Sequence, residues 1–376
     1  MVEENMLVQD DIGRSTLLSY LATLLLCVTV VMGVSWIYTA TQRERFLESG
    51  YSVWNAKRSL VSHCDLGQVV VFGDSRADSA LVPARLKKVA TNLAVAGGTP
   101  IESYFFVKSM LECESKPTVL MLSFNPGAFE ILQPWLWDNA ARYGALGWRE
   151  LSEVRREAAR LNDKSYLAVT PKLGLDGIVR DIAYGYGFPA IYFDSLLDGR
   201  LIARTDMNRQ RFNEVVLARG YPSYGHAAQQ AGARNEGEQK SIPFAPLAIQ
   251  QSYFEATLAM LERAGIKTYF LITPYNTRAG KTHDQRYNAA YLAYLHRIDV
   301  QYSGFQLLQH QQPVWAETMF VDGAHLSQEG AQIFSRLLNR CIEDAANMAD
   351  LGIACDFNQA AGADELITAD LDLVKK

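Results

Sequence analysis

The sequence predicts an α/β fold with a parallel sheet, preceded by a membrane anchor. Short, apolar, β-branched runs alternate with segments whose apolar residues recur at helical spacing, which is the pattern of βαβ units. The runs are apolar at consecutive positions, as expected for strands that helices cover on both faces. Near the N-terminus, residues 15–42 include no charged side chain.

Composition bounds the class of protein. The chain has 376 residues, of which 49% are hydrophobic, so it can bury a large core in one big domain or two smaller ones. Its net charge of −5 argues against a nucleic-acid partner, because no basic groove is evident. The six histidines show no metal-ligand spacing and the five cysteines form no CxxC pair, so we expect no structural metal and no cofactor.

Changes in composition predict five segments. These are a short tail at 1–14, a transmembrane anchor at 15–42, a helical stalk at 43–66, an α/β domain at 67–348 with an irregular insertion at about 130–245, and an acidic tail at 349–376. Within the insertion, the polar, turn-rich stretch 219–241 predicts an excursion or lid. We expect the acidic tail to be solvated and loosely ordered.

The anchor is long enough to cross a membrane. Thr16 to Tyr38 would span roughly 30 Å of hydrocarbon as a helix, with Trp36 and Tyr38 where aromatic rings favour the interface. A buried core helix would rarely lack a charged face over so many residues. A cleaved signal peptide is the nearer alternative, but the apolar run is too long and lacks a small-x-small cleavage site. We therefore expect an uncleaved, single-pass anchor in the inner (cytoplasmic) membrane.

The side of the membrane on which the domain lies follows less directly. Only Arg14 closely precedes the anchor, while Arg43 and Arg45 follow it, which slightly favours a cytoplasmic domain. Long domains translocate largely regardless of such charges. The chemistry described below favours the extracytoplasmic, periplasmic side.

The cysteines bear on the same question. Cys27 lies in the anchor, and the other four cysteines allow one or two disulfides on an oxidising side of the membrane. Cys341 and Cys355 are close enough in sequence to pair locally. Four buried free thiols are the alternative.

Strands and helices are expected in alternation along the domain. The strands are expected at 68–73, 90–97, 118–124 and 266–274. Helices are expected at 100–114, 246–265 and 285–298, with a turn and a further helix within 322–345.

The first strand runs directly into Gly73, Asp74 and Ser75. In an open parallel sheet, ligands bind at the carboxyl ends of the strands. Ser75 would begin the next helix, whose unpaired N–H groups favour developing negative charge, so it is a candidate nucleophile that needs a base. Alternatively, Asp74 or Ser75 merely caps that helix.

A candidate base lies near the end of the domain. Asp322 and His325 are three residues apart in a turn before a helix. This spacing lets the carboxylate accept the imidazole N–H and set its tautomer, which leaves the other ring nitrogen to take the proton of Ser75. The alternative is a surface Asp-Gly turn with an incidental histidine.

Acyl chemistry also needs donors for a tetrahedral oxyanion, each worth about 3 kcal/mol. Gly97 follows the second strand and can bring its backbone N–H close to a ligand. Asn125 follows the third strand and can donate from its amide, and the N–H of Ser75 is a third candidate. Alternatively, Gly97 belongs to a plain loop and Asn125 begins a turn.

Together these residues resemble the four sequence blocks of the SGNH (GDSL-like) hydrolase superfamily. The blocks, in order, are Gly73-Asp74-Ser75, Gly97, Asn125 and Asp322-x-x-His325. The resemblance covers about residues 66–126 and 266–345. It implies a flavodoxin-like three-layer α/β/α fold, with Ser75 as nucleophile, His325 as base, Asp322 as its orienting carboxylate, and Ser75, Gly97 and Asn125 as the oxyanion hole.

Two blocks depart from the family's pattern. The third usually reads Gly-x-Asn-Asp, where this chain has Ser-Phe-Asn-Pro at 123–126, and Arg76 stands where many relatives have leucine. The GDSR turn, the N-terminal anchor and the strand ending ITPYN resemble the membrane-anchored branch of the superfamily. That branch includes polysaccharide O-acetylation proteins and, more distantly, the D-alanine transfer protein. In it, acyl groups usually arrive through a membrane-bound O-acyltransferase partner.

Two further features are candidates for substrate binding. Arg76 could hold an anionic glycan or an acyl donor, or else form a salt bridge within the domain. Trp135 and Trp137, with Tyr143 and Trp148, could stack on a sugar, or else pack inside their loop.

The resemblance therefore predicts a membrane-anchored serine acyltransferase that acts on acyl (acetyl) esters of an envelope or secreted polysaccharide through an acyl-Ser75 intermediate. With water as acceptor, the same site would be an esterase or deacetylase. A non-catalytic assembly protein of a polysaccharide-modification complex is a third alternative, although it would have no need of Ser75, Asp322 and His325. A phosphate-binding protein is disfavoured, since neither GxxxxGKS nor GxGxxG is present.

Overall fold

Five parallel strands form the main sheet of the computed structural model, which describes residues 2–130, 136–167, 175–187, 197, 201–227, 243–278, 284–347, 355 and 357. In chain order the strands are β1 (Val69–Gly73), β2 (Ala90–Asn92), β3 (Val119–Ser123), β4 (Lys267–Phe270) and β6 (Phe305–Leu307). Their spatial order is β2-β1-β3-β4-β6, and every neighbouring pair is parallel. The predicted α/β fold with a parallel sheet is thus confirmed.

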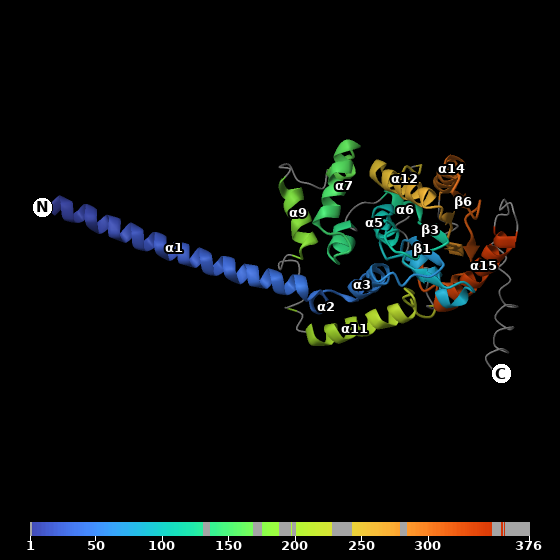
Figure 1. Ribbon diagram of the computed structural model, residues 1–376, viewed down its shortest axis with the longest axis horizontal. Coiled ribbons are helices and arrows are strands. Elements are labelled where there is room, and N and C mark those ends of the chain that lie inside the picture. Colours follow the sequence, from blue (N-terminus) through green and yellow to red (C-terminus); the bar gives the residue numbers. More distant parts are fainter. Residues whose placement is uncertain are drawn as a thin grey trace.

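Helices cover both faces of this sheet (Figure 1). Side chains alternate between the faces, so Val70 and Phe72 enter one core while Val69 and Val71 enter the other. The first core is completed by α3 (Ser49–Ser62), α5 (Pro100–Met110), α12 (Ala248–Arg263) and α14 (Gln285–Gln301). The second is completed by α4 (Ser75–Ala80) and α15 (Gln328–Asn347).

Strands β2 and β4 are shorter than predicted, and β4 ends at Phe270 rather than at 274. Strand β2 ends at Asn92 rather than at 97, because the chain leaves the sheet there and forms the loop that holds Gly97. Strand β6 was not predicted, since its three residues include the polar Gln306 and are too few to show a period. A further parallel pair, β5 (Tyr275–Asn276) and β7 (Val314–Trp315), lies outside the main sheet.

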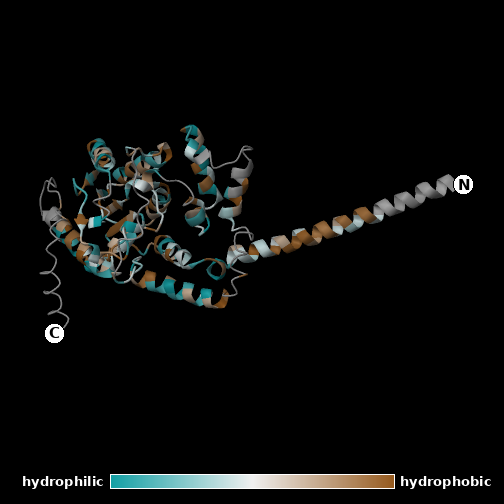
Figure 2. Ribbon diagram, turned by 180° about the vertical axis from the view of Figure 1, so that it is seen from behind, coloured by the Kyte–Doolittle hydropathy of each residue, from teal (hydrophilic) through white to brown (hydrophobic). Residues whose placement is uncertain are grey.

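The long helix α1 (Val2–Thr41) projects from the body and is apolar from Thr16 to Thr41 (Figures 1 and 2). Its most apolar window is entirely exposed, which is the opposite of a buried core helix. Among the described residues, this is the one helix long and apolar enough to cross a membrane.

The segment predicted as a stalk belongs to the body. After α2 (Arg43–Phe46), helix α3 buries Trp54 and Lys57 among the core side chains. The long helix α11 (Leu201–Leu217) packs along both, and Asn208 on it donates to the backbone carbonyls of Glu44 (2.7 Å) and Leu47 (2.8 Å). A stalk was the wrong interpretation, because the sequence does not show that α11 covers this segment.

The predicted irregular insertion is largely helical where it is described. Besides α11 it contains α6 (Pro126–Glu130), a π-helical turn (Leu136–Ala141), α7 (Trp148–Arg160), α8 (Lys164–Leu167) and α9 (Leu175–Gly185). Two 3-10 turns, at Pro83–Arg85 and Glu317–Met319, complete the described elements.

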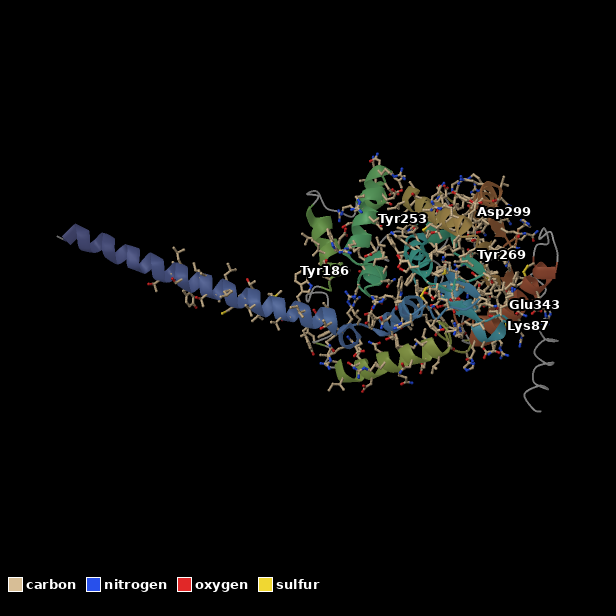
Figure 3. All side chains as sticks on the ribbon, in the orientation of Figure 1. Lys87, Tyr186, Tyr253, Tyr269, Asp299 and Glu343 are labelled. Atoms are coloured by element: carbon tan, nitrogen blue, oxygen red, sulfur yellow. A yellow bond between two sulfur atoms is a disulfide. The ribbon has the colours of Figure 1, made fainter. Side chains whose placement is uncertain are left out.

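Two disulfides and an ion pair tie distant segments together. Cys64 is bonded to Cys113, and Cys341 is bonded to Cys355 as the local spacing suggested. Lys87 pairs with Glu343 of α15 at 2.8 Å (Figure 3). Within the predicted acidic tail, Cys355 is therefore held by its disulfide and Phe357 is buried; the rest of that tail lies outside the described residues.

Candidate active site

Ser75 stands at the carboxyl end of β1. A Cβ atom on Gly73 would lie 2.0 Å from the carbonyl oxygen of Ser123, so only glycine fits where the strand turns into α4. Asp74 caps α4, because its Oδ1 accepts the backbone N–H of Arg76 at 2.9 Å. After β1 the chain forms β2 on one side of it and then crosses to form β3 on the other side, so Ser75 lies at the topological switch point of the sheet.

His325 and Asp322 are fixed by the loop that precedes α15. A backbone bridge between Phe320 and Leu326 closes this loop. Oδ1 of Asp322 accepts the backbone N–H groups of Ala324 (2.8 Å) and His325 (2.9 Å). The carboxylate is therefore positioned by its own turn, independently of Ser75.

The three side chains form a continuous hydrogen-bond chain. Nε2 of His325 lies 2.8 Å from Oγ of Ser75, across a separation of 250 residues. Nδ1 of His325 lies 2.8 Å from Oδ2 of Asp322. Burial alone would raise the pKa of Asp322, but its hydrogen bonds with His325 and the backbone, together with the His325 charge, hold that pKa at about 2. An ionised Asp322 accepts the Nδ1 proton, which leaves Nε2 as the acceptor for the Ser75 proton.

The predicted oxyanion donors gather at the same edge of the sheet. Gly97 has φ +69°, in the region that favours glycine. The loop that holds Gly97 lies beside the end of β1, since the backbone N–H of Val95 donates to the Gly73 carbonyl at 3.0 Å. Asn125, two residues beyond β3, donates both its backbone N–H and its Nδ2 to Oδ2 of Asp74 at 2.5 Å. A carboxamide has two N–H bonds, so Asp74 takes one and fixes the direction of the other.

The candidate substrate contacts are placed differently. Arg76 is 3% exposed, and its guanidinium stacks on the ring of Tyr275 at 4.3 Å, so in this conformation it points into the protein. Trp137 is also 3% exposed and donates its indole N–H to Asp181 at 3.0 Å, which makes the sugar-stacking interpretation wrong for this residue. Tyr143 is buried as well, while Trp135 lies outside the described residues.

Sequence reasoning missed the group that supports His325 from the side. The ring of Tyr224 stacks on the imidazole at 5.2 Å, and its hydroxyl donates to Oδ2 of Asp78 at 3.1 Å. Burial and the Asp78 charge raise the pKa of Tyr224 well above its usual value, so the hydroxyl stays a donor. Tyr224 belongs to the stretch predicted as a lid, 219–241, of which residues 228–241 lie outside the described part.

Asp78 is itself half of a buried ion pair. Lys57 of α3 pairs with it and also donates to the carbonyl of Ala94, and both charged side chains are almost completely buried. Burial lowers the pKa of Lys57 and raises that of Asp78, while their mutual attraction opposes both shifts. Ser75 and Asp78 are one turn apart on α4, and that spacing was the available signal in the sequence.

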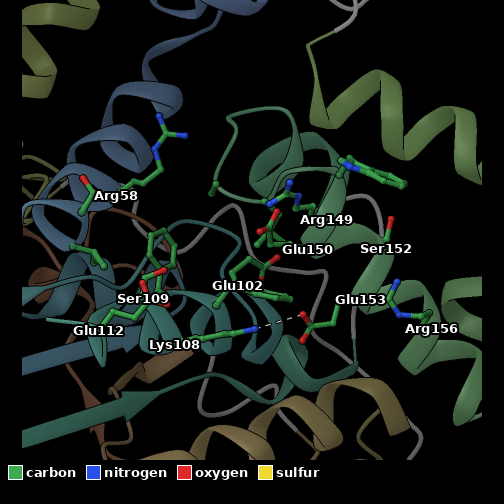
Figure 4. A pocket seen from close by; sticks show the side chains of 17 residues that line it. Arg58, Glu102, Lys108, Ser109, Glu112, Arg149, Glu150, Ser152, Glu153 and Arg156 are labelled. Carbon is green, nitrogen blue, oxygen red and sulfur yellow. Dashed lines mark ion pairs between the residues drawn. The ribbon is translucent and has the colours of Figure 1, made fainter.

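Among the cavities lined by described residues, two are relevant to the site. The larger, of about 590 Å³, lies between α5 and α7 and is lined by Glu102, Lys108 and Trp148 among others (Figure 4). None of Ser75, His325 and Asp322 lines it. The smaller, of about 280 Å³, is lined by Asp78, Tyr224, Ala96, Trp54 and Arg211. Ser75, His325 and Asp322 do not line this cavity either, but it adjoins the candidate site, because its lining includes Tyr224, which stacks on His325, and Ala96, which precedes Gly97.

Comparison with known proteins assigns no family to this chain. No protein-family model matches the chain, and no curated protein matches its sequence. The site is therefore defined by its residues: a Ser75–His325–Asp322 hydrogen-bond chain at the carboxyl edge of a parallel sheet, beside a cavity.

Proposed function

We propose that this protein is a membrane-anchored serine O-acyltransferase of the SGNH type, which transfers acyl groups to an envelope or secreted polysaccharide. The observation that carries the proposal is the hydrogen-bond chain from Ser75 through His325 to Asp322. A hydroxyl is a weak nucleophile, and such a chain is the usual means of activating it.

The architecture supports the SGNH assignment. The strand order β2-β1-β3-β4-β6 is the flavodoxin-like order 2-1-3-4-5, in which the ligand site lies at the carboxyl end of β1 and β3. Ser75, Gly97 and Asn125 come from the ends of three neighbouring strands, in the order that the family's blocks require.

The mechanism begins with attack of Ser75 on an ester carbonyl. Nε2 of His325 takes the proton of Oγ as the new C–O bond forms, and Asp322 stabilises the imidazolium. The N–H groups of Ser75 and Gly97 and the amide of Asn125 would hold the oxyanion. Collapse of the tetrahedral intermediate expels the donor alcohol, which leaves with the proton from His325. An acceptor hydroxyl then attacks acyl-Ser75, gives its proton to His325, and releases the ester as Oγ is reprotonated.

The location and partners follow from the same proposal. Two disulfides suit an oxidising compartment, which favours the periplasmic side of the inner membrane. A membrane-bound O-acyltransferase would supply the acyl donor, and a polysaccharide hydroxyl would be the acceptor. Tyr224, which stacks on His325, lines a cavity of about 280 Å³ that has room for a small acyl group or one sugar unit.

The test uses the full-length chain in nanodiscs, with Ser75→Ala and the matched control Ser303→Ala, whose serine is exposed on the surface. An activated acetyl ester is supplied with and without a deacetylated polysaccharide. Loss of ester and acetyl on the polysaccharide are both measured. We expect wild type and Ser303→Ala to acetylate the polysaccharide, and Ser75→Ala to do neither reaction.

The other outcomes separate the alternatives. Ser75-dependent ester loss that ignores the polysaccharide would make the protein an esterase. Equal behaviour of wild type and Ser75→Ala would leave Ser75 as a turn residue and favour the non-catalytic assembly protein.

A further inference from the structure

The body of the protein contacts the end of α1 that lies nearest to it. The apolar part of α1, Thr16–Thr41, has 26 residues and is about 39 Å long, which exceeds a hydrocarbon core of about 30 Å by about 9 Å. The end of the helix nearest the body therefore lies among the lipid headgroups. Trp36, an aromatic residue of the kind that favours this layer, lies there.

Tyr186 and Gly187 lie against this same stretch of α1. The indole N–H of Trp36 donates to the carbonyl of Tyr186 at 3.0 Å, and Oγ1 of Thr39 donates to the carbonyl of Gly187 at 3.2 Å. Thr39 is 4% exposed, so the contact excludes solvent. Because Trp36 lies about 8 Å along the helix from Thr41, these contacts bring Tyr186 down to the level of the headgroups.

Apolar side chains are exposed around this contact. Helix α9 runs across the end of the body that faces the anchor, and the first turn of α11 reaches the same end (Figure 1). Tyr186, just beyond α9, is labelled beside the base of α1 (Figure 3). The exposed fractions are 61% for Val179, 49% for Tyr186 and 79% for Ile202. Apolar residues are exposed elsewhere on the body as well, such as Val300 at 89%, so the position of these three on the elements that reach the anchored end, rather than their exposure, carries the argument.

We propose that Val179, Tyr186 and Ile202 form an apolar collar that inserts at the boundary between the headgroups and the acyl chains of the membrane that α1 crosses. The occupant is lipid, because the collar continues the apolar surface of the anchor and lies at the depth the anchor sets. The body is then held at two points and cannot swing freely about α1. The cavity of about 280 Å³ also includes Ser49 and Gly50, which closely follow the anchor in sequence, so the collar fixes its height above the bilayer.

The experiment measures contact with lipid directly, and it does not depend on catalysis. The full chain with Cys27→Ser receives one new cysteine, Ile202→Cys or Val179→Cys, which is labelled with bimane after the disulfides have formed. Val300→Cys is the matched control, since Val300 is 89% exposed on α14, away from the anchor. Each protein is placed in nanodiscs of phosphatidylcholine with plain or brominated acyl chains, because bromine quenches bimane on contact.

We expect brominated lipid to quench the labels at Ile202 and Val179, and to leave the label at Val300 unchanged. The change Ile202→Glu should also reduce quenching at Val179, because a carboxylate is costly among acyl chains. Equal fluorescence in both lipids at Ile202 and Val179 would overturn the proposal and leave the collar to solvent or a membrane-protein partner. Either result leaves the acyl-transfer proposal standing.

Discussion

His325 is held by a different partner at each of its ring nitrogens and by a third on its face. Nδ1 faces Asp322, Nε2 faces Ser75, and the ring stacks on Tyr224. Each contact removes a freedom of the imidazole: its tautomer, its direction and its tilt. Catalytic geometry requires such restraint, because small displacements of a base cost large factors in rate.

The orienting role of Asp322 can be tested with Asp322→Asn. An amide keeps the size of the side chain but favours the wrong imidazole tautomer, so kcat should fall on the order of 10³–10⁴-fold with little change in stability. The pKa of Asp322 is about 2, so its carboxylate remains ionised at pH 4 and above and should not shape the acid limb of the activity profile. Steady-state kinetics would measure this, with the exposed Asp206→Asn on α11 as control. Near-normal activity of Asp322→Asn would assign the orienting role elsewhere.

Glu102 makes stability depend on pH. Its carboxyl caps α5 by accepting from Thr99 at 2.8 Å, but it is 1% exposed, and burial raises its pKa to about 7. Below pH 4.5 the group is protonated in both the folded and the unfolded chain. Between pH 4.5 and 7 only the unfolded chain loses the proton, so the free energy of unfolding falls as pH rises, by about 3 kcal/mol in total.

The change Glu102→Gln removes that titration. Between pH 4.5 and 8, the free energy of unfolding of wild type should fall by about 3 kcal/mol relative to that of Glu102→Gln. Denaturant unfolding at each pH measures this difference. The control is Glu112→Gln, at an exposed residue that lines the same cavity, and its free energy of unfolding should depend on pH as that of wild type does. Parallel pH profiles for wild type and Glu102→Gln would contradict the raised pKa.

At the scale of elements, helices α3 and α5 hold the first core against the sheet. Lys57 on α3 reaches Asp78 and Trp54 packs near Phe106 of α5, so α3 supports both the core and the site. The Cys64–Cys113 disulfide joins the chain just after these two helices. The Cys341–Cys355 disulfide closes a shorter loop after α15.

The two disulfides should contribute unequal amounts to the free energy of unfolding. A cross-link stabilises mainly by restricting the unfolded chain, and the enclosed separations are 49 and 14 residues. Replacing both cysteines of a pair by alanine should therefore cost about 4 kcal/mol for Cys64–Cys113 and about 3 kcal/mol for Cys341–Cys355 in the chain-entropy model. Chemical unfolding of the two double variants measures the difference. A larger loss for the shorter loop would show that native packing, rather than loop entropy, dominates.

At the scale of the whole molecule, α11 holds the segment that follows the long apolar helix α1 against the body. Asn208 is 2% exposed, donates to Glu44 and Leu47, and accepts the hydroxyl of Ser52 at 2.9 Å. One side chain thus satisfies backbone groups of α2 and a residue of α3. Without it, buried carbonyls would lose their partners.

The change Asn208→Ala should lower the free energy of unfolding by about 2–4 kcal/mol, because it leaves two carbonyls and a hydroxyl unpaired. It should also loosen the junction with α1, which limited proteolysis of the chain in nanodiscs would detect as earlier cleavage near residues 42–48. The exposed Asn213→Ala on the same helix is the control. Equal stability and equal cleavage for the two variants would show that α11 does not secure the anchor.

Local patterns sufficed for several features of this protein. The uncharged apolar run predicted the long apolar helix α1, and consecutive apolar residues identified β1 and β3. Asp322 and His325 could be paired because three residues in a turn leave few arrangements. These features depend on neighbours in the chain, so the sequence alone determined them. Strand β6 could not be predicted in this way, since its three residues, with a polar one at the centre, are too few to show the alternation of a strand.

Contacts between distant segments were decided only by the tertiary structure. That His325 meets Ser75 across 250 residues, that Tyr224 stacks on the imidazole, and that Lys57 reaches Asp78 all depend on how α3, α4 and α15 pack on the sheet. The same packing buries Trp137 and joins the expected stalk to the body. The physical reason is that side-chain burial depends on which surfaces meet, and a pattern along one segment does not specify its partner.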